Sequence, residues 1–152
     1  EGKRMNNELV TVELAQIADY RYENRFGAGV PPLVSDEPAP LGGGQGPSPV
    51  HLLCAAVGNC LSDSLLFALR KFKQQPEPLR ATVQAEVGRN PEGRLRILQM
   101  TATLHLGVPA QQLEHLDRVL GQFESFCTVT QSVGQGIPIA VKVLDAEGRV
   151  LK

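Results

Sequence analysis

A long apolar segment over residues 49–73 constrains this chain more than any other feature of its sequence. Ser48 and Pro49 form a typical helix start, because serine caps a first turn and proline fits the first helical position. Before Ser62 the segment has almost no polar stripe, so the predicted helix is apolar on nearly all sides. One modest sheet from the same chain covers only one of those sides. We therefore expect a homodimer with this helix at its centre.

Alternating apolar and polar residues predict strands on both sides of the apolar segment. The alternating segments are residues 9–17, 19–26, 79–89, 94–106 and 137–143, and Leu33 and Val34 form a short further predicted strand. The alternation slips between Ile97 and Leu98, which indicates a β-bulge. Pro109 opens a second predicted helix, whose apolar residues continue at helical spacing to Phe123. Strands, buried helix, hairpin, helix and strand in this order are typical of an α+β fold.

Length and composition suit one domain, residues 9–152, preceded by a flexible N-terminus over residues 1–8 that need not all be native, with Met5 as a possible native start. A net charge of -1 and an ordinary hydrophobic content argue against disorder, and the scattered cations form no basic stripe for nucleic acid. No apolar run reaches the roughly 20 residues that cross a membrane. The start of the chain lacks the apolar region of a signal peptide. We expect a cytoplasmic protein that binds neither nucleic acid nor membrane.

Cys60 in the apolar segment and Cys127 beyond the second helix make redox chemistry the first hypothesis. The chain has 3 cysteines, an odd number that argues against a disulfide scaffold and for a reducing compartment. There, one thiol can attack an oxidant and a second can resolve the product as a disulfide. No short-range spacing ties Cys60 to Cys127, so only the fold can bring them together. Cys54 points roughly 120° away from Cys60 around the helix and is assigned to core packing, although it remains a rival for Cys127.

The sequence predicts neither a metal site nor a cofactor site. His51 and Cys54 could share a helix face, but four metal ligands at standard spacing are not evident. The glycine-rich stretch 42–46 lacks the Lys-Ser/Thr pair that a phosphate-binding loop needs. A thiol in apolar surroundings stays protonated and inert, so Cys60 needs a cationic or hydrogen-bonding neighbour to react.

Residues 46–60 run from Gly-Pro-Ser-Pro into the cysteine-bearing helix, and residues 127–133 run from Cys127 toward the last strand, with the predicted hairpin between them. Two cysteines at these places in this element order resemble the OsmC/Ohr family of thiol-dependent hydroperoxide reductases, over about residues 10–145. The resemblance implies the OsmC-like fold, in which antiparallel sheets wrap a long central buried helix in an intertwined homodimer. It also implies active sites at the dimer interface.

The resemblance further implies a peroxidase that needs no metal or organic cofactor. Cys60 would attack organic hydroperoxides, and hydrogen peroxide less well, and become a sulfenic acid. Cys127 would resolve that acid as a Cys60–Cys127 disulfide. A dithiol reductant, such as a lipoylated protein, would restore both thiols.

The sequence departs from the family pattern at one position. The family's hydroperoxide reductases place a glutamate directly after the helix-opening proline, where this chain has Val50. Asp36 or Glu37 in the preceding loop could supply the missing carboxylate. The family also uses an arginine from an early strand to hold the thiolate, and Arg21 and Arg25 both lie in that region.

Two other functions stay open at this point. The first, which Val50 favours, is an OsmC-fold protein that binds a small apolar or thiol-reactive ligand, or serves in a stress response, without efficient turnover. The second is a dimeric scaffold whose three thiols are inert.

Overall fold

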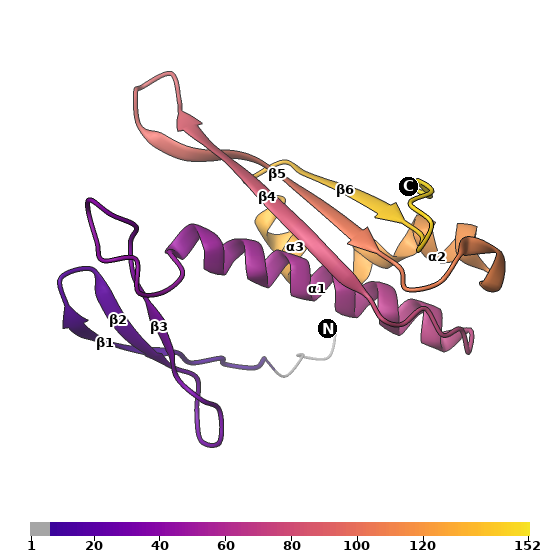
Figure 1. The fold of residues 1–152 in the computed structure, drawn as a ribbon, viewed down its shortest axis with the longest axis horizontal. Coiled ribbons are helices and arrows are strands. Elements are labelled where there is room, and N and C mark those ends of the chain that lie inside the picture. Colours follow the sequence, from indigo (N-terminus) through magenta and orange to yellow (C-terminus); the bar gives the residue numbers. More distant parts are fainter. Residues whose placement is uncertain (1–6) are drawn as a thin grey trace, which may run out of the picture. The chain divides into compact units, whose positions relative to one another are not determined.

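The computed structural model describes residues 7–152, which divide into two compact units that are considered separately (Figure 1). The first unit extends to Leu52, and the second is Leu53–Lys152. Of the predicted flexible segment 1–8, residues 1–6 lie outside the described residues. Two small sheets and one long helix confirm the predicted α+β class.

The first unit contains an antiparallel sheet in the order β1-β2-β3. Its strands are β1 (Glu13–Ala18), β2 (Arg21–Arg25) and β3 (Leu33–Ser35). The first strand begins later than predicted, and Leu9 and Val10 before it are 93% and 82% exposed. The buried side chain of Asn24 joins β2 to β3, since its amide donates to the carbonyl of Leu33 at 3.0 Å and to the hydroxyl of Ser35 at 2.9 Å.

Helix α1 (Pro49–Lys71) begins where the sequence predicts and ends two residues early, before Lys73 adopts a left-handed conformation with φ 59°. The hydroxyl of Ser48 accepts a hydrogen bond from the backbone N–H of His51 at 3.3 Å, as a capping residue does. Only one stripe of the helix is fully buried within the chain: Val57, Gly58, Leu61, Leu65 and Leu69. An opposite stripe stays exposed: Ala55, Ala56, Asn59, Asp63, Phe67 and Arg70.

By length and composition alone, α1 could also cross a membrane, because its 23 residues include a window with a mean hydropathy of 1.7. This finding corrects the expectation that no apolar stretch is long enough. The core helix of a folded protein passes the same test. The buried stripe of α1 shows that this helix packs in the core, so its length and composition are weak evidence for a membrane-spanning segment.

The second unit contains a mixed sheet in the order β4-β5-β6. Its strands are β4 (Arg80–Arg89), β5 (Leu95–His105) and β6 (Ile139–Leu144). The hairpin β4–β5 is antiparallel, and its register passes from Glu86↔Gln99 to Val87↔Ile97, which leaves Leu98 as the extra residue of the predicted bulge. Strand β6 pairs parallel with β5, so the expectation of purely antiparallel sheets was wrong. A parallel pair needs a long crossover connection, and the helical segment between β5 and β6 supplies it.

This crossover is a series of short helices rather than the single helix predicted after Pro109. It comprises η1 (Ala110–Gln112), α2 (Leu116–Gln122), η2 (Phe123–Phe126) and α3 (Thr128–Val133). The break falls at His115, which has a left-handed φ of 61° and stacks on Phe72 with ring centroids 4.6 Å apart. The N–H of Glu114 donates to the side chain of Gln74 at 2.8 Å. Contacts with the segment after α1 therefore replace the helical bonds that the sequence pattern suggested.

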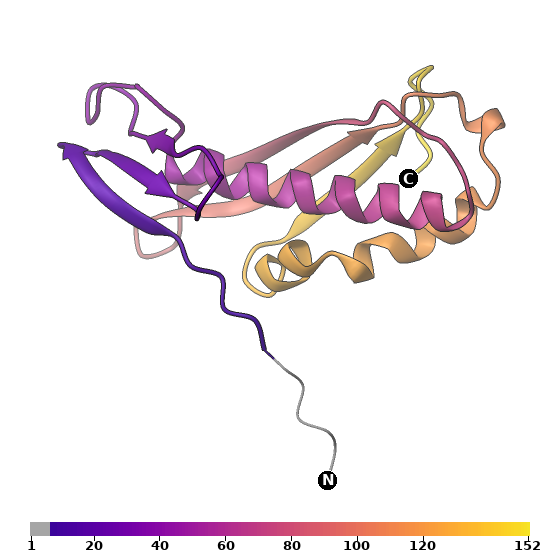
Figure 2. The same ribbon diagram turned by 90° about the horizontal axis from the view of Figure 1, so that it is seen from below.

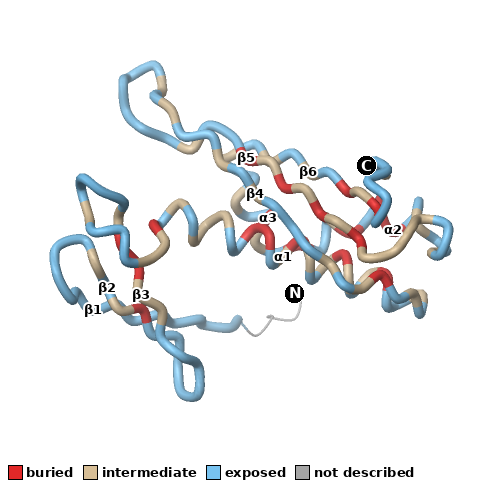
Figure 3. Tube along the Cα trace, in the orientation of Figure 1, coloured by how far each residue is buried: buried red, intermediate tan, exposed pale blue. Residues whose placement is uncertain are grey.

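The core of the second unit lies between one face of its sheet and the helices that pack on that face (Figure 2). Helix α1 and the α2–α3 segment lie side by side there, and Figure 3 shows buried positions recurring along α1 and β5. At Gly58 the helix approaches β4 closely, because a Cβ atom there would lie 2.9 Å from Cγ2 of Val83. This packing fixes the face of α1 that carries Cys60 against the start of α3.

Candidate active site

Cys60 of α1 and Cys127, which directly precedes α3, meet in the second unit. The Sγ atom of Cys60 accepts a hydrogen bond from the backbone N–H of Val129 at 3.4 Å. The Cys60 thiol is also close enough to Cys127 to raise the pKa of that residue. Both thiols are free. The fold thus brings together two sulfur atoms that are far apart in the sequence.

Backbone hydrogen bonds on both sides hold Cys127 in place. Its N–H donates to the carbonyl of Glu124 in η2 at 3.1 Å, and its own carbonyl accepts from the N–H of Gln131 in α3 at 2.9 Å. Its side chain is fully buried and donates its S–H to Oγ1 of Thr130 at 2.9 Å. Cys127 therefore has little freedom to move away from Cys60.

The two thiols differ in their surroundings. Burial raises the pKa of Cys127, and the neighbouring thiol of Cys60 raises it further, whereas the hydroxyl and backbone of Thr130 act in the opposite direction. Cys127 is therefore a protonated thiol at neutral pH. Cys60 is half-buried and has a backbone donor directed at its sulfur. A thiol in this position is the better placed of the two to meet a reagent from outside.

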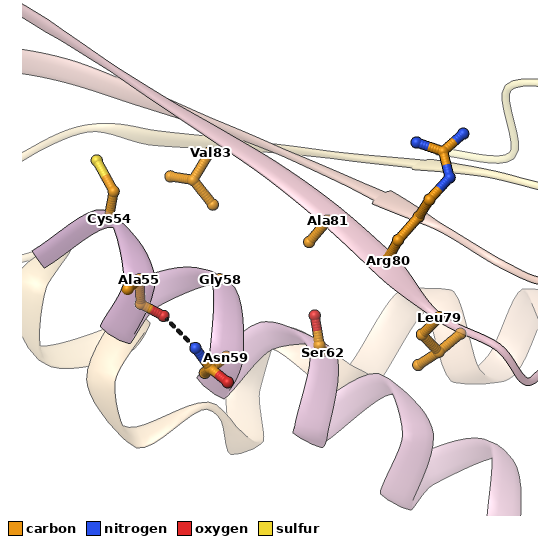
Figure 4. A pocket seen from close by; sticks show the side chains of 9 residues that line it. All are labelled: Cys54, Ala55, Gly58, Asn59, Ser62, Leu79, Arg80, Ala81 and Val83. Carbon is orange, nitrogen blue, oxygen red and sulfur yellow. Dashed lines mark hydrogen bonds between the residues drawn. The ribbon is translucent and has the colours of Figure 1, made fainter. Parts of the chain in front are cut away.

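Cys54 belongs to a different part of α1. It lines a hollow of about 460 Å³ between α1 and β4, together with Gly58, Ser62, Arg80 and others (Figure 4). Neither Cys60 nor Cys127 lines this hollow. Burial raises the pKa of Cys54, and Figure 4 shows its sulfur at the opposite end of the hollow from Arg80. The structure therefore separates Cys54 from the thiol pair.

In the first unit, Arg21 of β2 binds Asp36 in the loop after β3. Its Nε donates to Oδ2 of Asp36 at 3.2 Å, and the side chain of Asp36 is 1% exposed. Burial opposes ionisation of Asp36, but hydrogen bonds from the N–H groups of Gln45 and Glu37 and from Arg21 outweigh it and hold the pKa of Asp36 below its usual value. The loop also closes on the arginine, since a Cβ atom on Gly43 would lie 2.7 Å from Nη2 of Arg21.

Arg25 and Glu37 are the other charged residues predicted from the sequence as site candidates. Neither of their side chains takes part in the Arg21–Asp36 pair. The side chain of Arg25 is 68% exposed, and its Nε pairs with Glu23 at 2.6 Å on the same strand. Glu37 gives its backbone N–H to Asp36 at 2.8 Å. Its own carboxylate makes no hydrogen bond or ion pair within residues 7–152. Asp36, rather than Glu37, is therefore the acid that holds Arg21.

Sequence reasoning missed Thr130 and the N–H of Val129 as neighbours of the two sulfurs. The only sequence signal for Thr130 is its position three residues after Cys127 in a hydroxyl-rich stretch. A backbone N–H leaves no trace in a sequence, and α3 itself was not predicted. Within the described part of the chain, no group of three or more His, Cys, Asp or Glu residues could hold a metal ion.

A second hollow, of about 260 Å³, lies between the C-terminal half of α1 and the α2–η2 segment. Its walls include Phe67, Phe72 and Phe126, and the first and last of these are each 66% exposed. Nζ of Lys71 lies 5.7 Å from the ring centre of Phe67, and Cζ of Arg118 lies 5.7 Å from that of Phe72. The hollow therefore combines aromatic walls with two cationic side chains.

Residues 42–142 match the family described as OsmC-like protein. No curated protein matches the sequence significantly. An OsmC-like protein of unknown function from Vibrio cholerae has a similar structure, with a TM-score of 0.76 and 13% identity over 91% of this chain and 100% of the other.

Two further solved structures are described as organic hydroperoxide resistance proteins. The one from Legionella pneumophila, also described as OsmC, has a TM-score of 0.69 and 14% identity over 91% of this chain and 98% of the other. The one from Elizabethkingia anophelis has a TM-score of 0.69 and 15% identity over 91% and 98%. At these identities the likenesses establish a shared fold.

Proposed function

Since the chain belongs to the OsmC-like protein family, we propose that it is a thiol peroxidase that reduces organic hydroperoxides, and hydrogen peroxide less well. Cys60 is the attacking residue and Cys127 the resolving residue. The single observation that carries this proposal is the proximity of the two free thiols, since the sulfur of Cys60 on α1 is hydrogen-bonded to the N–H of Val129, two residues after Cys127. The hydroperoxide resistance proteins of the same fold support the choice of substrate class.

The proposed reaction has two steps before reduction. The Cys60 thiolate attacks the terminal oxygen of R–O–O–H, the O–O bond breaks, and the alkoxide takes a proton and leaves as an alcohol. Cys60 is then a sulfenic acid. The Cys127 sulfur attacks the Cys60 sulfur, an S–S bond forms, and the hydroxyl of the sulfenic acid leaves with the proton of Cys127 as water. A dithiol reductant, of which a lipoylated protein is one example, returns both thiols and becomes a disulfide itself.

The surroundings of the two sulfurs support this division of roles. Cys60 is the more accessible sulfur, and the N–H of Val129 supports negative charge on it. Cys127 is buried and protonated, so it is a poor nucleophile toward peroxide in solution. It needs only to reach a neighbouring sulfur once Cys60 has been oxidised.

Arg21 is the proposed arginine of the reaction. Its guanidinium is oriented by the buried carboxylate of Asp36, whereas Arg25 pairs with Glu23 on the surface. Asp36 is the proposed substitute for the carboxylate that the family pattern places where this chain has Val50. Arg21 would stabilise the reacting sulfur and polarise the peroxide, as a fixed cation does for developing negative charge.

The active form is proposed to be a homodimer in the reducing cytoplasm. The exposed stripe of α1 and the exposed apolar residues of β1, such as Leu14 and Ile17 at 61% and 53%, offer apolar surface that a second copy would bury. Three free thiols suit a reducing compartment.

The aromatic hollow favours organic substrates over hydrogen peroxide. Phe67 and Lys71 follow Cys60 at intervals of seven and eleven residues, which places them on the same face of α1, about 10 Å and 16 Å further along. Phe126 directly precedes Cys127. An alkyl or aromatic group attached to the peroxide would find apolar walls here.

Steady-state turnover of tert-butyl hydroperoxide with a dithiol reductant tests the proposal. We expect the Cys60→Ser and Cys127→Ser variants to lose sustained turnover and the matched control Cys54→Ser to keep it. Equal loss in Cys54→Ser, or no turnover by the unaltered protein, would contradict the proposal. The second result would favour a ligand-binding protein without efficient turnover, the function that Val50 supports.

A further inference from the structure

A buried hydroxyl contacts the sulfur of Cys127. Thr130 is 6% exposed and Cys127 is 0% exposed, and the S–H of the cysteine points at Oγ1 of the threonine at 2.9 Å. Neither the attack on the peroxide nor the closure of the disulfide, as proposed, yet involves this threonine. Because this buried hydroxyl contacts a sulfur that must react, it is in a position to influence the step in which Cys127 attacks Cys60.

The local backbone makes this contact a fixed one. Cys127 directly precedes α3, and Thr130 is the third residue of that helix, so its side chain turns back toward Cys127. The carbonyl of Cys127 accepts the N–H of Gln131 at 2.9 Å, and that of Thr130 accepts the N–H of Gly134 at 2.8 Å. The same turn gives the N–H of Val129 to Cys60. One helical turn thus sets the positions of both sulfurs.

We propose that Thr130 is a positioning residue for the resolving step, which holds the sulfur of Cys127 toward Cys60 and stays bonded to it as the proton leaves. This inference rests on the proposed function of the two cysteines. A hydroxyl suits the task because it both accepts and donates hydrogen bonds. It accepts from the thiol of Cys127 in the resting protein and, after rotation, donates to the sulfur as the S–H bond breaks.

The effect of Thr130 on the pKa of Cys127 agrees with this role. Burial and the neighbouring Cys60 oppose ionisation of Cys127, and the contacts of Thr130 are the ones that favour it. Loss of the hydroxyl would leave a buried sulfur that must become an anion without its side-chain donor. The expected effect is a slower resolving step, with no change in the attack of Cys60 on the peroxide.

Two substitutions separate this role from simple core packing. Thr130→Val keeps the shape and removes the hydroxyl, whereas Thr130→Ser keeps the hydroxyl and removes a methyl group. Thr128→Val, at an exposed threonine of the same helix, is the matched control. Thermal unfolding of each variant shows that it is folded before its kinetics are compared.

Rapid-mixing experiments measure the two steps separately in the fully reduced protein. With tert-butyl hydroperoxide, the rate of Cys60 oxidation depends on peroxide concentration and the rate of disulfide closure does not. A second assay uses the aromatic disulfide dithiobis(nitrobenzoate). The Cys60 thiolate displaces one thionitrobenzoate anion, and Cys127 then attacks the Cys60 sulfur, loses its proton to solvent and releases the second anion.

We expect closure in both assays to be about five- to tenfold slower in Thr130→Val. Thr130→Ser and Thr128→Val should close at nearly the original rate, and the oxidation step should be unchanged in all variants. Unchanged closure in Thr130→Val, or a Thr130→Ser variant as slow as Thr130→Val, would overturn the inference. Failure of the unaltered protein to react with peroxide while the aromatic disulfide assay gives the expected pattern would overturn the peroxidase proposal and support the role of Thr130.

Discussion

The sulfur of Cys60 on α1 accepts a hydrogen bond from the backbone N–H of Val129 in the first turn of α3, at 3.4 Å. This contact ties the helix that carries the candidate nucleophile to the short helix that directly follows its partner, Cys127. It also gives the sulfur a donor that no substitution of a side chain at position 129 can remove, except by proline.

Replacing Val129 with proline is expected to slow the oxidation of Cys60 by organic hydroperoxide about tenfold or more. Proline removes the N–H while fitting the first turn of a helix, and a hydrogen bond to a charged group contributes about 1.5–3 kcal/mol. Val129→Ala keeps the N–H and serves as the control. Stopped-flow kinetics with tert-butyl hydroperoxide give both rates, and equal rates in the two variants would show that this donor does not support the reaction.

Asp36→Asn is expected to lower stability most at neutral pH and less in acid. Hydrogen bonds hold the pKa of Asp36 below its ordinary value of 3.8, so its contribution is present above that value and is lost as the pH falls through the lower folded pKa. The difference in the free energy of unfolding between the original protein and the variant should therefore shrink in acid. Denaturant titrations across this pH range measure it.

Asp63→Asn, at an exposed position of α1, is the control for that series. Its free energy of unfolding should follow that of the original protein at every pH. A difference for Asp36→Asn that stays constant with pH would contradict the account of a stabilising Arg21–Asp36 pair.

Substitution of Ala56 by arginine is expected to separate the proposed homodimer into monomers. Ala56 lies on the exposed stripe of α1, and a buried unpaired charge at an interface costs several kcal/mol. Glu92→Arg in the exposed β4–β5 turn is the control and should stay dimeric. Sedimentation velocity at low micromolar concentration gives the masses. A monodisperse monomer of the original protein would contradict the dimer.

Phe67→Ala is expected to raise the KM for an aromatic hydroperoxide, such as cumene hydroperoxide, by roughly tenfold, because apolar contact with a large side chain contributes about 1.5 kcal/mol or more. The KM for hydrogen peroxide should not change. Leu95→Ala, at an exposed position of β5, is the control. A parallel change for both peroxides would show that the hollow does not bind the organic group.

Much of the fold follows from local sequence patterns. The alternation of side chains predicts five of the six strands, and a slip of that alternation predicts the bulge at Leu98, because each depends on neighbouring residues. The direction in which two strands pair does not depend on neighbouring residues, so the parallel pairing of β6 with β5 could not be predicted. The break at His115 arises from stacking on Phe72 and from the bond between Glu114 and Gln74, which are contacts between distant segments.

The candidate site divides in the same way. Unusual sequence surroundings and the family resemblance identify Cys60 and Cys127, but only the fold shows that their thiols are neighbours. Asp36 and Glu37 are adjacent acids, and the sequence could not choose between them. The geometry of the loop distinguishes the two acids, because the buried carboxylate of Asp36 accepts hydrogen bonds from the loop backbone and from Arg21. Thr130 was missed because α3 was not predicted.

Peptide mapping of the reduced protein after reaction with an equimolar amount of tert-butyl hydroperoxide tests the central claim most directly. The account predicts one dominant new disulfide, between Cys60 and Cys127, with Cys54 still a free thiol. Slow oxidation spread over all three cysteines, or a bridge that includes Cys54 as often as Cys127, would contradict it.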